Sequence, residues 1–184
     1  VRKLSQGLTL EEFRALRANV AGIVAATPRK RTTPTKVLPK PQREMPAVYG
    51  IEPGYQSIAG LRVVRGRFFD KDENEQAAAV CVLGTAARTS LFGSADPIGQ
   101  MVKVNEQWFR VIGELGPQLS VEGAVPGLPS QDRNNLIYVP LSAALLRLED
   151  AYSYLKDEID AVYLQLSSST DSLATAELLR GLLN

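Results

Sequence analysis

The sequence predicts an α+β protein with two lobes, one of which is built from both ends of the chain. Two observations predict this fold class. Helix–strand units stand at both ends, and the stretch between them is rich in short strands and turns. We assign residues 1–65 and 136–184 to an α/β lobe and residues 66–135 to a β-rich insert. A chain of 184 residues with 45% hydrophobic residues is long enough for one or two compact domains.

The N-terminal unit begins with a helix signal. Thr9 and Glu12 have the spacing of a capping box, in which each side chain accepts a hydrogen bond from an orphan backbone N–H. Apolar residues then recur at helical spacing, and the apolar run 20–26 predicts a strand that ends at Thr27-Pro28. A capped helix followed by a buried strand is typical of an α/β layer.

Residues 28–46 differ from the rest of the chain, because five prolines recur there among lysines and arginines. Proline lacks a backbone donor, so we expect an exposed loop or a pair of edge strands and exclude a central strand. The candidate partner-binding residues are Arg29, Lys30, Arg31 and Lys36. An anionic partner and a solvated arm both fit this basic cluster. No aromatic residue interleaves with the bases, which argues against a platform for single-stranded nucleic acid.

The other elements are predicted from alternation, helical spacing and turn residues. In chain order they are strands over 48–51 and 61–64, a polar break over 70–76, a buried strand over 80–83, a helix over 85–92 closed by Gly93, a hairpin over 102–111, a loop over 116–135, a strand over 136–139, a helix that starts at Pro140, a strand over 162–166 and a final helix over 173–183. This order places both chain ends in one lobe.

The sequence offers no catalytic constellation. It contains no histidine, which excludes Ser-His-Asp and Cys-His catalysis, and its one cysteine, Cys81, lies in an apolar run and is predicted to be buried. Asp70, Asp72 and Asn74 resemble the start of a calcium loop, but Glu75 stands where that loop needs glycine and Cys81 where it needs glutamate. No Walker loop is present. We therefore predict no enzymatic activity, no metal and no cofactor.

The bulk properties also limit the partners. The net charge of +1 gives no indication of nucleic-acid binding. The chain contains no apolar run of the roughly 18 residues that a membrane helix needs. It begins at Val1, so we expect a piece of a longer protein whose membrane segments lie outside it.

Several segments, taken in order, resemble the periplasmic core domain shared by MacB, lipoprotein-releasing and FtsX-type ABC permeases. They are GLRVVRGRFF at 60–69, VCVLG at 80–84, LFG at 91–93, DPIGQ at 96–100, FRVIG at 109–113 and IYVP at 137–140. Their order and spacing cover most of the chain, whereas residues 28–46 and 116–135 match less clearly.

This resemblance implies a porter-like α/β lobe and a β-rich insert often called Sabre, placed between two membrane helices at the periplasmic or extracytoplasmic face of a bacterial inner membrane. It implies a permease homodimer or heterodimer driven by an ABC ATPase in a separate domain or subunit. The domain would pass that motion to cargo or to a periplasmic adaptor, carrier or lipoprotein, and would bind no nucleic acid. Exporter, lipoprotein extractor and cell-division or cell-wall regulator all stay open.

Two other classes of protein also fit the sequence. One is a free-standing secreted interaction or carrier domain without catalytic activity, and the other is an enzyme with an unrecognised carboxylate site. Apolar stretches of about 20 residues on both sides of the chain would favour the transporter domain over a free-standing domain.

Overall fold

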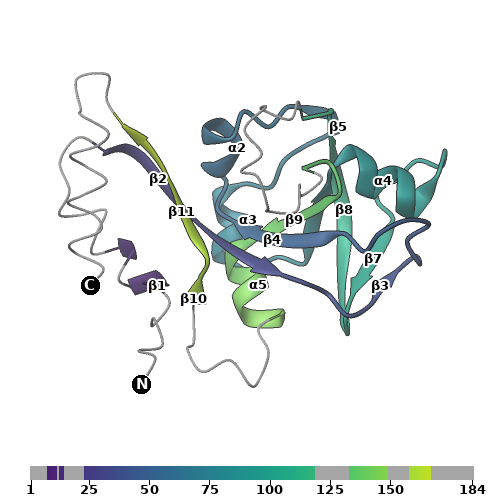
Figure 1. Cartoon of the computed structure of the whole chain (residues 1–184), viewed down its shortest axis with the longest axis horizontal. Coiled ribbons are helices and arrows are strands. Elements are labelled where there is room, and N and C mark those ends of the chain that lie inside the picture. Colours follow the sequence, from purple (N-terminus) through teal and green to yellow (C-terminus); the bar gives the residue numbers. More distant parts are fainter. Residues whose placement is uncertain (1–7, 12, 15–22, 119–132, 149–157, 167–184) are drawn as a thin grey trace, which may run out of the picture.

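The computed structural model describes residues 8–11, 13–14, 23–118, 133–148 and 158–166 (Figure 1). In this part of the chain, nine strands form a mixed sheet in the order β11-β2-β4-β9-β6-β8-β7-β3, with β5 paired to β8. A separate ladder joins β1 to β10. The molecule is therefore a sheet-dominated α/β structure.

The strands and helices have the following bounds. The strands are β1 (Leu8–Thr9), β2 (Ile23–Thr32), β3 (Val37–Leu38), β4 (Ala47–Ile51), β5 (Val63–Gly66), β6 (Val80–Leu83), β7 (Met101–Val104), β8 (Gln107–Leu115), β9 (Leu136–Pro140), β10 (Glu158–Ile159) and β11 (Ala161–Leu166). The helices are α2 (Tyr55–Ile58), α3 (Lys71–Glu75), α4 (Thr85–Phe92) and α5 (Leu141–Arg147).

Side chains of the central strands point alternately to the two faces of the sheet. Each face is covered by its own core cluster. Cys81 and Leu83 pack in one cluster with residues of α4 and α5. Val82 belongs to a second cluster, which contains Tyr55 of α2 and Phe69. The core therefore lies in two layers around the strands β6, β8 and β9.

Segments from near the two chain ends lie together. Leu8 pairs with Ile159 in the antiparallel β1–β10 ladder. Phe13, Ala26 and Ile159 form a buried cluster beside that ladder. Val1 and Asn184 themselves, Glu12 of the predicted capping box and the predicted final helix lie outside the described residues, as do residues 119–132 of the predicted loop.

The exclusion of a central strand after Pro28 was wrong. β2 continues to Thr32 and lies between β11 and β4 in the sheet. It pairs with β11 up to Arg29 and with β4 from Arg29 onward. Pro28 therefore has a strand partner on one side only, which is the edge-like setting in which a sheet tolerates proline.

Several local predictions are confirmed. β6 and α4 have the predicted bounds, β7 and β8 form the predicted hairpin, and α5 follows Pro140. Two short helices were missed, of which α3 replaces the predicted polar break. The Asp70 side chain accepts a hydrogen bond from the backbone N–H of Glu73, and Glu73 completes a capping box.

The sheet runs across the boundaries proposed between the two lobes. β3, from residues 1–65, pairs with β7, and β6 pairs with β9. The division into residues 1–65 with 136–184 and an insert over 66–135 stays a prediction.

Candidate functional site

A cation and four tyrosines gather where β2 lies between β11 and β4. This group, the tyrosine junction, consists of Arg29, Tyr49, Tyr55, Tyr138 and Tyr163. The guanidinium carbon of Arg29 lies 4.3 Å from the ring centroid of Tyr49 and 5.1 Å from that of Tyr163. Its Nη1 donates a hydrogen bond to the Tyr163 hydroxyl. Both contacts join β2 to a neighbouring strand.

The register of the sheet creates this junction. Arg29 pairs with Ala161 on one side and with Ile51 on the other. Tyr163 and Tyr49 each stand two residues from those partners, so both are diagonal neighbours of Arg29 on the same face. Diagonal neighbours in a sheet are within reach of aromatic and long side chains.

The remaining rings extend the contact into the core. The rings of Tyr55 and Tyr163 stand nearly perpendicular, with centroids 5.0 Å apart and an interplanar angle of 89°. Tyr138, the register partner of Tyr49, has its ring centroid 6.0 Å from that of Tyr49. Edge-to-face pairs of this kind are each worth about 0.5–1.5 kcal/mol beyond burial.

Burial keeps two phenols of the junction in their neutral form. Burial is the main cause that raises the pKa of Tyr138 to about 12, and burial followed by the neighbouring tyrosines raises the pKa of Tyr55. Both phenols therefore stay neutral at physiological pH. The Arg29 Nε is buried and has no hydrogen-bond partner among the described residues. The ring faces therefore supply much of the attraction that the cation receives.

The other predicted partner-binding residues lie apart from this junction. Lys30 is half-buried, whereas Arg31 and Lys36 are exposed. The backbone N–H of Arg31 donates to the Asp160 carboxylate, next to the β10–β11 turn. Lys36 stands beside β3, where its carbonyl accepts a 2.7 Å hydrogen bond from the backbone N–H of Asn105. The Arg29 side chain thus packs on the tyrosine rings, and the structure does not gather the four cations in one patch. The role of these residues in partner binding stays a prediction.

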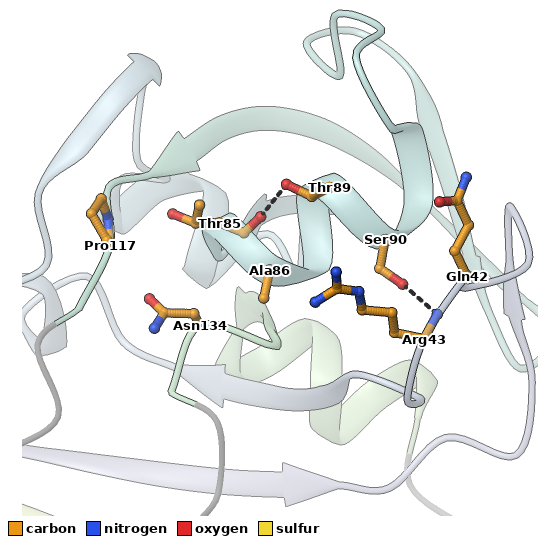
Figure 2. Close-up of a pocket in the computed structure, with 8 residues that line it drawn as sticks. All are labelled: Gln42, Arg43, Thr85, Ala86, Thr89, Ser90, Pro117 and Asn134. Carbon is orange, nitrogen blue, oxygen red and sulfur yellow. Dashed lines mark hydrogen bonds between the residues drawn. The ribbon is translucent and has the colours of Figure 1, made fainter.

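A pocket of about 360 Å³ lies beside α4 (Figure 2). It is lined by Gln42, Arg43, Thr85, Ala86, Thr89, Ser90, Pro117 and Asn134. The backbone N–H groups of Ala86 and Ala87 both donate to the carbonyl of Asn134, at 3.0 and 3.2 Å. Two donors of the first helical turn are therefore already occupied, so this end of the helix is not open to an anion in the way that uncapped helix starts are.

The described residues contain no cluster of three or more histidine, cysteine, aspartate or glutamate side chains that could hold a metal ion. Cys81 is completely buried, as predicted. Burial raises the pKa of its thiol, so the reactive thiolate is not formed at neutral pH.

Comparison with known proteins identifies the family. The model of the MacB-like periplasmic core domain matches residues 2–182. The chain belongs to this family. The MacB-like domain is 33% identical over 137 residues to the macrolide export ATP-binding/permease protein MacB of Bdellovibrio bacteriovorus, an alignment that covers 74% of the chain and 19% of that protein. The chain thus spans about a fifth of the length of this curated relative.

Two solved structures have the same fold. The periplasmic region of MacB from Actinobacillus actinomycetemcomitans superposes with a TM-score of 0.73 at 22% identity, covering 99% of this chain and 77% of that one. The extracellular domain of the transporter YknZ from Gram-positive bacteria gives a TM-score of 0.73 at 20% identity, covering 95% and 83% of the two chains. The predicted resemblance to MacB-type permease domains is confirmed, and with it the assignment as a periplasmic domain of an ABC-transporter permease. Within the described ranges, every helix is too short or too polar to cross a bilayer.

The tyrosine junction was not predicted from the sequence. Its tyrosines are at positions 49, 55, 138 and 163, and nothing local links them to Arg29. The signal present in the sequence was an arginine directly after Pro28, in a segment that fitted both a solvated arm and the binding of an anionic partner. Only the pairing of β2 with both β11 and β4 brings these residues together.

Proposed function

We propose that this MacB-like domain transmits the ATP-driven conformational change of its permease to cargo or partner proteins on the periplasmic side. The observation that carries the proposal is the path of β2. This single strand of ten residues runs from the cluster beside the β1–β10 ladder into the main sheet. At about 3.3 Å per residue it spans roughly 33 Å, and neighbouring strands hold it along most of its length. A displacement of β11 is therefore carried by β2 to β4 and β9.

Membership of the family supports a proposal about the partners. We propose that ATP hydrolysis takes place in a separate nucleotide-binding domain or subunit, and that the permease is a homodimer or heterodimer whose membrane helices flank this chain. A periplasmic adaptor, carrier or lipoprotein would receive the motion. The relative from Bdellovibrio is named as an ATP-binding/permease protein, which supports an ABC-transporter system.

Spin labels test this transmission without knowledge of the cargo. In the full permease in lipid nanodiscs, Gln165→Cys on β11 and Met101→Cys on β7 are labelled in separate samples, since both side chains are exposed. The native Cys81 is buried and does not compete for the label. Distances between the labels of the two protomers are then measured with and without ATP and vanadate. We expect both reporters to move in the wild-type protein.

The decisive comparison weakens the tyrosine junction. In the Arg29→Met/Tyr163→Phe double variant we expect the reporter at 165 to keep its ATP-dependent movement and the reporter at 101 to lose most of it. Arg43→Met, which removes an exposed arginine from outside the junction, is the matched control. If neither reporter moves in the wild-type permease, the domain does not transmit motion. If both still move in the double variant, the junction is not the route.

A further inference from the structure

The β7–β8 hairpin leaves large apolar side chains uncovered on one face. This hairpin face consists of Leu38, Met101, Lys103, Trp108 and Arg110. Lys103 is the register partner of both Leu38 and Trp108, and Met101 is that of Arg110, so all five side chains point to the same side of the sheet. Trp108 is 50% exposed and Met101 41% exposed. The opposite face of the same strands is buried in the core and carries Val102, Val104 and Phe109.

A cation lies beside the exposed ring. The Nζ of Lys103 lies 5.9 Å from the ring centroid of Trp108 and 2.7 Å from the Glu106 carboxylate. The hydrogen bond from Lys103 chiefly, and the charge of Lys36 to a lesser degree, lower the pKa of Glu106. Arg110 is exposed and forms no ion pair within the described ranges. Lys103, Lys36 and Arg110 thus outnumber the one carboxylate of Glu106, which leaves an excess of positive charge on this part of the surface.

The hairpin face lies far from β1, β10 and β11, the strands that belong to segments near the two chain ends. β7 and β3 stand at one end of the sheet order and β11 at the other. Figure 1 shows the same separation, with β1, β10 and β11 on one side of the molecule and β3 and β7 on the opposite side. In the proposed permease the ends of the domain lead to the membrane, so this face points away from the bilayer and toward periplasmic proteins.

We propose that the hairpin face binds a protein surface whose apolar centre is ringed by carboxylates, with Trp108 as the anchor. Tryptophan, methionine and arginine are enriched in protein interfaces, and tryptophan is prominent among the residues that dominate binding energy. Arg110 and the lysines select for acidic groups, and complementary charge adds specificity and association rate. The choice of a protein over a membrane rests on the proposed function, because that function sets the direction in which the face points.

A synthetic peptide that alternates glutamate with leucine tests the required chemistry on the 184-residue chain. Trp108 is the single tryptophan, so its emission reports contact with this face directly. We expect a blue shift of that emission on binding, and a dissociation constant, measured by anisotropy of the labelled peptide, that rises with salt. Trp108→Ala should weaken binding roughly tenfold or more. Arg110→Gln should weaken it several-fold and flatten the salt dependence.

The controls separate this face from other exposed groups. Leu146→Ala removes a side chain that is 71% exposed on α5, and Lys71→Gln removes an exposed cation on α3, so both should leave the affinity unchanged. Arg110→Gln keeps the test valid if Trp108→Ala disturbs the hairpin. The proposal is overturned if the peptide does not bind, or if Arg110→Gln and Trp108→Ala both bind like wild type. It is also overturned in favour of a membrane role if phosphatidylglycerol vesicles shift the emission and the peptide does not. None of these outcomes depends on the spin-label result, because the peptide assay requires neither ATP nor the permease.

Discussion

Removal of the Tyr163 hydroxyl group should destabilise the domain by an amount that depends on the charge of Arg29. Tyr163→Phe keeps the ring that stacks beside Arg29 but removes the acceptor for its Nη1. The guanidinium is half-buried and its Nε already lacks a partner among the described residues. Hydrogen bonds to charged groups contribute about 1.5–3 kcal/mol. We expect Tyr163→Phe to lower the free energy of unfolding by about 2 kcal/mol.

The same substitution should cost much less when the charge is absent. Methionine at position 29 fills a similar volume and needs no acceptor, and the loss of the cation is partly offset because its desolvation is no longer required. In the Arg29→Met background we expect Tyr163→Phe to cost about 0.5 kcal/mol, so the coupling energy of the double-mutant cycle is about 1.5 kcal/mol.

Urea unfolding of the four proteins, followed by far-ultraviolet circular dichroism, measures this coupling. For a chain of this size, 1 kcal/mol corresponds to about 2–4 °C in the midpoint of thermal unfolding, so Tyr163→Phe alone should lower it by about 4–8 °C. Arg43→Met controls for the loss of an arginine outside the junction. Equal costs for Tyr163→Phe in both backgrounds would refute the reasoning, since the charge would then not depend on the hydroxyl.

Four further outcomes are expected, two of them for a matched pair of glycine variants. A Cβ at Gly50 would lie 2.4 Å from a buried alanine methyl of α5, so Gly50→Ala should destabilise by about 1–3 kcal/mol in urea unfolding. Gly54→Ala meets no atom within 4 Å and should be neutral or slightly stabilising. Cys81 should react with a thiol reagent only at the rate of unfolding, because its side chain is completely buried and the reagent cannot reach it in the folded protein. A hydrogen bond from Arg67 lowers the pKa of Glu73, so Glu73→Gln should destabilise at neutral pH and become silent in acid.

For each of these predictions, a particular result would contradict the reasoning. Equal stability of the two glycine variants would mean that α5 moves without cost. Rapid labelling of Cys81 in the native protein would show that the core opens locally. The pH dependence of Glu73 has a fixed sign: a depressed pKa contributes stability above the ordinary glutamate pKa of about 4.3, and that stability is lost as pH falls through the native value. A Glu73→Gln deficit that persists in strong acid would therefore contradict the role of Arg67.

The parts of the fold that the sequence predicted are those determined by near neighbours. The bounds of β6 and α4 follow from a short apolar run and a glycine after the helix, and that glycine, Gly93, does adopt a positive φ of 59°. α3 was missed although its capping box is present, because its five residues carry no apolar face to reveal a helical period.

The strand β2 shows why proline rules fail at long range. Proline is excluded from a strand that is paired on both sides, and whether a position is paired on both sides is decided by distant segments. Here β11 accompanies β2 before Arg29 and β4 accompanies it after, so no proline of β2 has two neighbours. The tyrosine junction could not be predicted for the same reason, since the register that brings Tyr163 to Arg29 joins residues more than a hundred positions apart.

The change of partner in β2 also explains why the junction stands where it does. A strand that passes from one neighbour to another is held by a single ladder on either side of the exchange, so the two ladders are joined through it at that point. Arg29 is the one position of the described ladders of β2 that is paired with both β11 and β4, and its side chain contacts a tyrosine on each of them. Side-chain contacts thus add to the backbone hydrogen bonds at the point where a displacement of β11 must pass to β4. A domain proposed to move a partner without chemistry of its own needs stiffness at this point more than anywhere else in the sheet, and loosening it should impair transmission before it impairs folding.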